Sequence, residues 1–99
     1  MSEQSVFKEK TIVELKKPQM YKVVLLNDDY TSMDFVVEVL VAVFHKSVSE
    51  STKIMLDVHH KGRGVVGIYT YDIASTKAAR VERMAEERGF PLKAIVEEE

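Results

Sequence analysis

The stretch that decides the fold is YKVVLLNDDYTSMDFVVEVL, residues 21–40. Its first six residues are almost continuously apolar and predict a β-strand over 21–26, in which only the start has a polar face. The chain then becomes sharply polar at the three residues NDD, 27–29, and a second apolar run begins at Met33. Apolar side chains recur there at helical spacing, which predicts a helix that runs to about Lys46.

This first helix carries apolar side chains on two lines, so we expect it to be central and covered on more than one side. One line is Met33, Val36, Val37, Leu40, Val41 and Phe44, and the other is Phe35, Val39 and Val43. The segment Thr31-Ser32-Met33-Asp34 has the spacing of a capping box, in which Thr31 is the expected N-cap and Asp34 reaches back to it.

The rest of the chain alternates between segments with apolar residues at helical spacing and short segments typical of strands. Ser47 and Glu50 form a second capping box, and the helix that follows is predicted to reach about Lys61 and to end at Gly62. A strand is expected over 64–71. Lys53, Asp57 and Lys61 are spaced by four and mark the solvated face of the second helix.

A third helix is expected to begin with Asp72 or Ser75 as its cap and to end at Gly89. Its predicted buried line is Ala74, Ala78, Val81 and Ala85. A short strand over 92–96 closes the chain. The predicted fold class is therefore α+β, with a small three-stranded sheet covered by three helices in the order β-α-α-β-α-β.

Bulk properties narrow the function classes. A chain of 99 residues favours one domain, and a net charge of −2 with scattered Lys and Arg argues against a nucleic-acid surface. The absence of cysteine excludes a disulfide framework and a thiolate metal site. With no membrane-length apolar run and no signal-peptide core, the expected localisation is cytoplasmic. Residues 1–19 are predicted to be a flexible N-terminal extension, and residues 20–97 to form the domain.

Two parts of the sequence are candidates for a functional site. The NDD joint lies between a strand and a helix, where Asn and Asp also form ordinary local turns. On the second helix, Met55, Val58 and His59 share one side. A histidine at the edge of an apolar stripe is commonly structural, and a metal site of His59 with Asp28 and Asp29 rests on no specific spacing. No nucleophile, histidine and acid stand in a recognisable catalytic spacing, and we expect no cofactor.

Three segments together resemble the ClpS adaptor family: YKVVLLNDDYTSMDFVVEVL, MLDVHHKGRGVVGIYT and STKAARVE. The resemblance covers about residues 18–96. It implies an adaptor rather than an enzyme, which binds proteins whose first residue is Leu, Phe, Tyr or Trp. It further implies delivery of those proteins to an AAA+ unfoldase coupled to the Clp peptidase.

The resemblance also implies roles for individual residues. Asn27, Asp29 and His59 would hold the free α-amino group of the substrate, with Asp28 adding charge and loop geometry. The side-chain pocket would be lined by Thr31, Met33, Val36, Met55, Val58 and Leu92, and the unfoldase would meet Tyr30, Asp72 and Lys77. Two other hypotheses remain open from the residues: a small acid-and-histidine metal-binding or hydrolytic domain, and a ribosome-associated interaction module.

Overall fold

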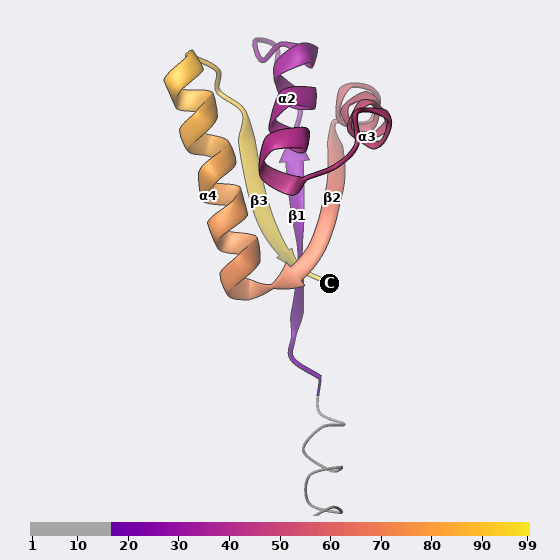
Figure 1. Ribbon diagram of the computed structural model, residues 1–99, viewed down its shortest axis with the longest axis vertical. Coiled ribbons are helices and arrows are strands. Elements are labelled where there is room, and N and C mark those ends of the chain that lie inside the picture. The colour runs from indigo at the N-terminus through magenta and orange to yellow at the C-terminus, as the bar shows by residue number, and fades with distance from the viewer. Residues whose placement is uncertain (1–16) are drawn as a thin grey trace, which may run out of the picture.

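The computed structural model describes residues 17–99, and it has the predicted order of strands and helices (Figure 1). The elements are β1 (Met20–Leu26), α2 (Met33–Phe44), α3 (Val48–Lys61), β2 (Arg63–Thr70), α4 (Tyr71–Arg88) and β3 (Lys93–Glu98). Residues 1–16, which hold most of the predicted N-terminal extension, lie outside the described residues. Within residues 17–99, no helix combines the length and the apolar character needed to cross a membrane.

The sheet has the strand order β2-β1-β3, and both neighbours run antiparallel to β1. Leu26 at the end of β1 pairs with Arg63, whereas Met20 at its start pairs with Thr70. The loop that follows β1 therefore lies at one end of the sheet, and α4 begins at the other (Figure 1). The predicted amine-binding residues of the loop after β1 therefore lie at one end of this seven-residue strand. Asp72, which was predicted to face the unfoldase, lies near the other end.

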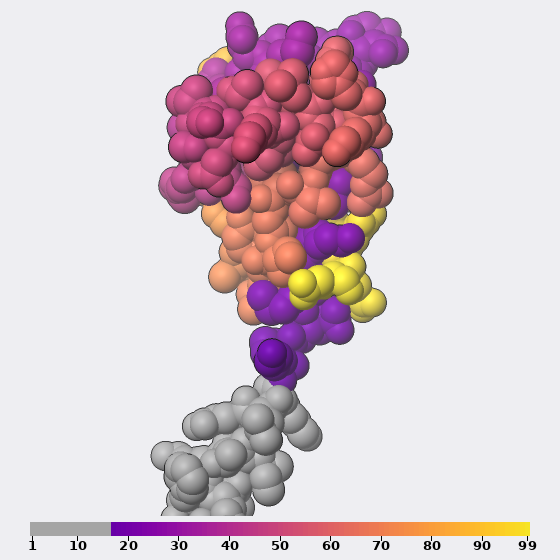
Figure 2. All heavy atoms as spheres, turned by 90° about the vertical axis from the view of Figure 1, so that its right-hand side faces the viewer, coloured from indigo at the N-terminus to yellow at the C-terminus, as the bar shows by residue number. Residues whose placement is uncertain are grey.

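The helices pack on the sheet and on one another. Helix α4 packs against all three strands, and α3 packs against α2 and the edge strand β2. Figure 2 shows α3 forming the upper part of one side of the molecule, with β2 below it. The predicted buried line of α4 is confirmed, since Ala74, Ala78, Val81 and Ala85 are all buried.

The prediction for α2 is right for six of its nine apolar residues, whereas Val37 is only partly buried and Met33 and Val41 are exposed. Its buried residues are Phe35, Val36, Val39, Leu40, Val43 and Phe44. Met33 and Val41 are 47% and 37% exposed, because one side of the helix faces solvent while the others meet the core. The helix also ends at Phe44, two residues before the predicted end, where His45 takes a left-handed conformation with φ 55°.

The predicted cap at Thr31 is wrong by one residue. Ser32 is the N-cap of α2, and its Oγ accepts a hydrogen bond from the Phe35 backbone N–H at 3.2 Å. Thr31 instead belongs to the preceding loop, because its N–H and hydroxyl both donate to Asp28. The residue three positions after Ser32 is Phe35, so no reciprocal capping box forms.

The second capping box is confirmed and the cap of the third helix is not. Ser47 Oγ accepts from the Glu50 N–H at 3.1 Å, and α3 ends at Gly62 as predicted. Helix α4 follows β2 directly, with Thr70 as an N-cap that makes no side-chain hydrogen bond, so neither Asp72 nor Ser75 caps it. The predicted end of α4 at Gly89 is confirmed.

Candidate functional site

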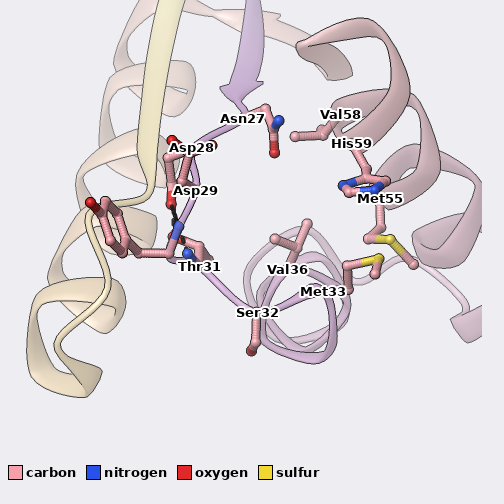
Figure 3. Close-up of a pocket in the computed structure, with 11 residues that line it drawn as sticks. Asn27, Asp28, Asp29, Thr31, Ser32, Met33, Val36, Met55, Val58 and His59 are labelled. Carbon is pink, nitrogen blue, oxygen red and sulfur yellow. Dashed lines mark hydrogen bonds between the residues drawn. The ribbon is translucent and has the colours of Figure 1, made fainter.

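A cavity of about 430 Å³ lies between the loop after β1, the first turns of α2 and the second half of α3 (Figure 3). This volume is within the range of about 300–1,000 Å³ that is typical of small-molecule pockets. Its lining residues are Asn27, Asp28, Asp29, Tyr30, Thr31, Ser32, Met33, Val36, Met55, Val58 and His59. The NDD joint and the shared side of α3, two separate predictions from the sequence, thus meet in one cavity.

A backbone hydrogen bond ties the two halves of the cavity together. The Asn27 N–H donates to the carbonyl of Gly62 at 3.0 Å, so the loop begins beside the end of α3. Gly62 ends that helix in a left-handed conformation with φ 86°, and its own N–H donates to the Val58 carbonyl at 3.0 Å. The polar loop is thereby held next to the last turns of α3, which carry Val58 and His59.

Gly64 lets β2 approach α3 closely beside Val58, which lines the cavity. A Cβ atom at this position would lie 2.7 Å from the Val58 side chain and 3.2 Å from the carbonyl oxygen of Ile54. The first contact is too short for two packed carbon atoms and the second is tight, so a larger residue would require the Val58 side chain or α3 to shift. The close approach fixes the position of Val58 at the base of the cavity.

Asp28 organises the loop on which the polar lining residues lie. One carboxylate oxygen accepts from the N–H groups of Tyr30 and Thr31 at 2.8 and 2.7 Å, and the other accepts from the Thr31 hydroxyl at 2.7 Å. Partial burial raises the pKa of Asp28, but the hydrogen bonds from Thr31 and Tyr30 outweigh it, so the pKa lies below its ordinary value. The hydrogen bonds of the Asp28 carboxylate therefore stabilise the conformation of the loop in which it lies.

The polar end of the cavity consists of Asn27, Asp29 and His59. Within residues 17–99, none of these three side chains makes a hydrogen bond to another protein group. Figure 3 shows Asn27 at the end of β1 and His59 on α3, on facing sides of the cavity. An amide oxygen, a carboxylate and an imidazole nitrogen are thus available to accept hydrogen bonds from a bound molecule.

The remaining walls are apolar. Val36 and Val58 are 5% and 2% exposed and close the inner part of the cavity. Met33 and Met55 both line the cavity, and Figure 3 shows their side chains on the same side of it. Met33 is half exposed and Met55 partly buried, so this pair forms the boundary between the cavity and solvent.

One prediction for this site needs correction, and one lining residue was not predicted. Leu92 does not line the cavity; it is 2% exposed and belongs to the hydrophobic core, because the chain enters the sheet there to begin β3. Ser32 lines the cavity and was not predicted to do so. Ser32 is the N-cap of α2 and lies between the polar loop and Met33, both of which line the cavity. A correct assignment of the cap in the sequence would have indicated that Ser32 lines it as well.

The three residues predicted to face an unfoldase are not together. Tyr30 is 78% exposed and borders the cavity. Asp72 and Lys77 line a second hollow of about 280 Å³ on the first half of α4, at the opposite end of the sheet. Lys77 also has a structural contact, because its Nζ donates to the Val43 carbonyl at 2.9 Å near the end of α2.

The metal-site hypothesis finds no support in the described part of the chain. Among residues 17–99, no three His, Asp or Glu side chains come together as ligands for one ion. The His59 and His60 rings pack edge to face with their centroids 5.1 Å apart, rather than converging on a common point.

Comparison with known proteins gives consistent matches over nearly the whole chain. Residues 16–95 match the family model described as ATP-dependent Clp protease adaptor protein ClpS. An ATP-dependent Clp protease adapter protein ClpS from Acetivibrio thermocellus is 65% identical over 99 residues, which is all of both chains. The one from Wolinella succinogenes is 57% identical over 91 residues, which is 92% of this chain and 87% of the relative.

The chain belongs to the ClpS family. The resemblance seen in the sequence is thereby confirmed, and the family is one of adaptors of the ATP-dependent Clp protease. A solved structure of ClpS2 from Agrobacterium tumefaciens, bound to L-phenylalaninamide, has the same fold. It superposes with a TM-score of 0.82 at 44% identity and covers 84% of this chain and 100% of the ClpS2 chain.

Proposed function

We propose that this protein is an adaptor that binds the free α-amino group and the bulky apolar first residue of substrate proteins. It then delivers them to an AAA+ unfoldase of the Clp protease. Family membership supports the adaptor role, and the ligand of the A. tumefaciens ClpS2 structure supports the kind of substrate. L-phenylalaninamide has a free amine, an apolar benzyl group and an amide at the place where a protein chain would continue.

The observation that carries this proposal is the division of the cavity into an acceptor end and an apolar end. An N-terminal ammonium has three N–H donors and no acceptor. Asn27, Asp29 and His59 offer one oxygen or nitrogen acceptor each, provided that His59 has an unprotonated ring nitrogen. The carboxylate of Asp29 also favours the positive charge. An apolar side chain on the same residue then extends toward Val36 and Val58.

Neither half of the site is sufficient by itself. Each charge-assisted hydrogen bond contributes roughly 1.5–3 kcal/mol, and burying a Leu or Phe side chain contributes about 1.5–3 kcal/mol. Loss of translational, rotational and side-chain freedom offsets much of this gain. The expected dissociation constant is therefore about micromolar, and removal of either half makes binding too weak to matter.

The test is a panel of fluorescent peptides that differ only in the first residue, each with a free and an acetylated amine. We expect Leu, Phe, Tyr and Trp peptides to bind, and acetylation to reduce affinity far more than exchange of Leu for Phe. Acetylation removes the charge and places a methyl-carbonyl group among the acceptors. Equal binding of free and acetylated peptides would refute the proposal, and indifference to the first residue would favour a general interaction module instead.

Variants locate the site within the same assay. Asn27→Ala and His59→Ala are expected to remove most peptide binding while the thermal midpoint changes little, because both side chains are exposed. His60→Ala is the matched control, since His60 is an exposed neighbour of His59 that does not line the cavity. A loss with His60→Ala equal to that with His59→Ala would refute the assignment of His59.

Delivery requires a second surface, and we propose the hollow around Asp72 and Lys77 for the contact with the unfoldase. Tyr30 lies at the far end of β1, about 20 Å away at roughly 3.4 Å per strand residue, so it would form a separate contact. Asp72→Lys is expected to slow degradation of a Leu-initiated substrate by the unfoldase–peptidase and to leave peptide affinity unchanged. Lys77 is a poorer probe because of its bond to the Val43 carbonyl. Normal degradation with Asp72→Lys would remove this surface from the proposal.

A further inference from the structure

One wall of the cavity presents an exposed methionine, Met33. Met33 is 47% exposed, whereas Met20, Met55 and Met84 are partly buried. Met55 and Met84 also pack against the hydrophobic core. Among the methionines of residues 17–99, Met33 is therefore both the most accessible and a lining residue of the cavity.

Exposure of a thioether makes it a target for oxidants. A lone pair of the sulfur attacks one oxygen of hydrogen peroxide, the O–O bond breaks, a sulfur–oxygen bond forms and water is released. The sulfur loses two electrons and the peroxide gains them, so the step balances with peroxide as the only co-reactant. The product, methionine sulfoxide, is polar, and methionine sulfoxide reductases return it to the thioether.

We propose that Met33 is an oxidation site that controls whether the cavity accepts apolar N-terminal residues, an inference that rests on the proposed function. The sulfoxide oxygen needs hydrogen bonds from water. A bound Leu or Phe side chain would displace that water, and the neighbouring Val36, Val58 and Met55 have no side-chain hydrogen-bond donor to replace it. Oxidation at this one atom thus opposes ligand binding without disturbing the acceptor end of the cavity.

The expected effect is a loss of affinity of about 5- to 100-fold, the range that corresponds to burying a polar group without a partner. Folding should be nearly unaffected, because Met33 lies on the solvent side of the first turn of α2. Linkage also predicts the reverse effect: a bound Leu-initiated peptide slows oxidation of Met33 and leaves that of Met84 unchanged.

The experiment measures binding of a Leu-initiated and a Phe-initiated peptide before and after a graded peroxide treatment of the full chain. Mass spectrometry of peptic fragments gives the extent of oxidation at each methionine, and circular dichroism gives the thermal midpoint. Two variants are compared, Met33→Leu, which keeps an apolar wall without sulfur, and Met84→Leu, the control on α4. Each variant is compared with its own untreated sample.

We expect wild type and Met84→Leu to lose affinity in proportion to Met33 oxidation, and a reductase with a thiol donor to restore it. Met33→Leu should change by less than about twofold after the same treatment. The inference is overturned if Met33→Leu loses as much affinity as wild type, or if fully oxidised Met33 leaves binding unchanged. Failure of the untreated wild type to bind either peptide would instead refute the proposed function, and this inference with it.

Discussion

Replacing Asp28 by asparagine or alanine is expected to lower both the stability of the fold and its affinity for N-terminal peptides. The Asp28 carboxylate accepts three hydrogen bonds of 2.7–2.8 Å, two from backbone N–H groups and one from the Thr31 hydroxyl. These bonds fold the loop so that Asn27 and Asp29, on either side of Asp28, line the same cavity. We expect Asp28 to act on the ligand by positioning its neighbours.

The size of the effect follows from the exposure of the loop. Three hydrogen bonds to a charged group would total roughly 5–9 kcal/mol at full value. The donors lie near the surface, however, and water can replace the carboxylate, as at a helix N-cap, where substitution costs about 0.5–2 kcal/mol. We therefore expect a loss of about 1–2 kcal/mol for Asp28→Ala and about 1 kcal/mol for Asp28→Asn, which keeps one acceptor oxygen.

These losses translate into measurable quantities. For a domain of this size, a change of 1 kcal/mol shifts the thermal midpoint by roughly 4–8 °C. Peptide binding must in addition order a loop that the variant no longer holds, and a cost of about 1.4 kcal/mol corresponds to a tenfold weaker dissociation constant. The prediction is thus a coupled loss, several degrees of stability and about tenfold in affinity.

The pH dependence has a definite sign. Because the pKa of Asp28 is lower in the folded protein than in the unfolded chain, its stabilisation is fully present above the unfolded pKa. It is lost as the pH falls through the lowered folded pKa. The difference in unfolding free energy between wild type and Asp28→Asn should therefore be constant from about pH 7 to pH 5 and shrink below about pH 4.

Urea unfolding followed by circular dichroism at several pH values measures the stability, and fluorescence anisotropy measures the affinity. Asp57→Asn is the control, because within residues 17–99 Asp57 forms only an exposed i,i+4 ion pair with Lys61 at 3.4 Å. Wild-type stability and affinity in Asp28→Asn would refute the reasoning. A large loss of affinity at unchanged stability would show that Asp28 contacts the amine itself and does more than position the loop.

Three further predictions test other parts of the molecule. Met33→Ala should admit peptides that begin with Ile or Val, because their branch at Cβ lies close to the backbone and the shorter side chain leaves room for it; no gain in anisotropy for these peptides would place the selectivity elsewhere. Ser51→Ala should raise the free energy of unfolding by about 1 kcal/mol, since the Ser51 hydroxyl is fully buried and, within residues 17–99, has no hydrogen-bond partner; a loss of stability in urea would contradict this. We also propose that residues 1–17 act in delivery and not in binding, so a chain that starts at Pro18 should keep its peptide affinity and lose degradation of a Leu-initiated substrate. Unchanged degradation would remove that role.

The sequence by itself determined the order of the elements and most of their ends. Alternation and helical spacing are local properties of the chain, and they predicted three strands and three helices correctly. Glycine at the ends of two helices was equally informative, because Gly62 and Gly89 adopt the left-handed conformation that stops a helix at little cost. The side of α3 that carries Met55, Val58 and His59 was also predictable, since helix geometry alone places them together.

Tertiary structure decided which of these local features meet. The backbone bond from Asn27 to Gly62 joins residues 35 positions apart, and no periodicity in either segment encodes it. The strand register separated Tyr30 from Asp72, and packing took Leu92 into the core instead of the cavity. The cap of α2 is Ser32 and not Thr31, because the Thr31 N–H and hydroxyl both donate to Asp28 and hold Thr31 in the preceding loop. Contacts of this kind depend on the relative positions of folded segments, which are set by the packing of the whole chain and not by any short stretch of it.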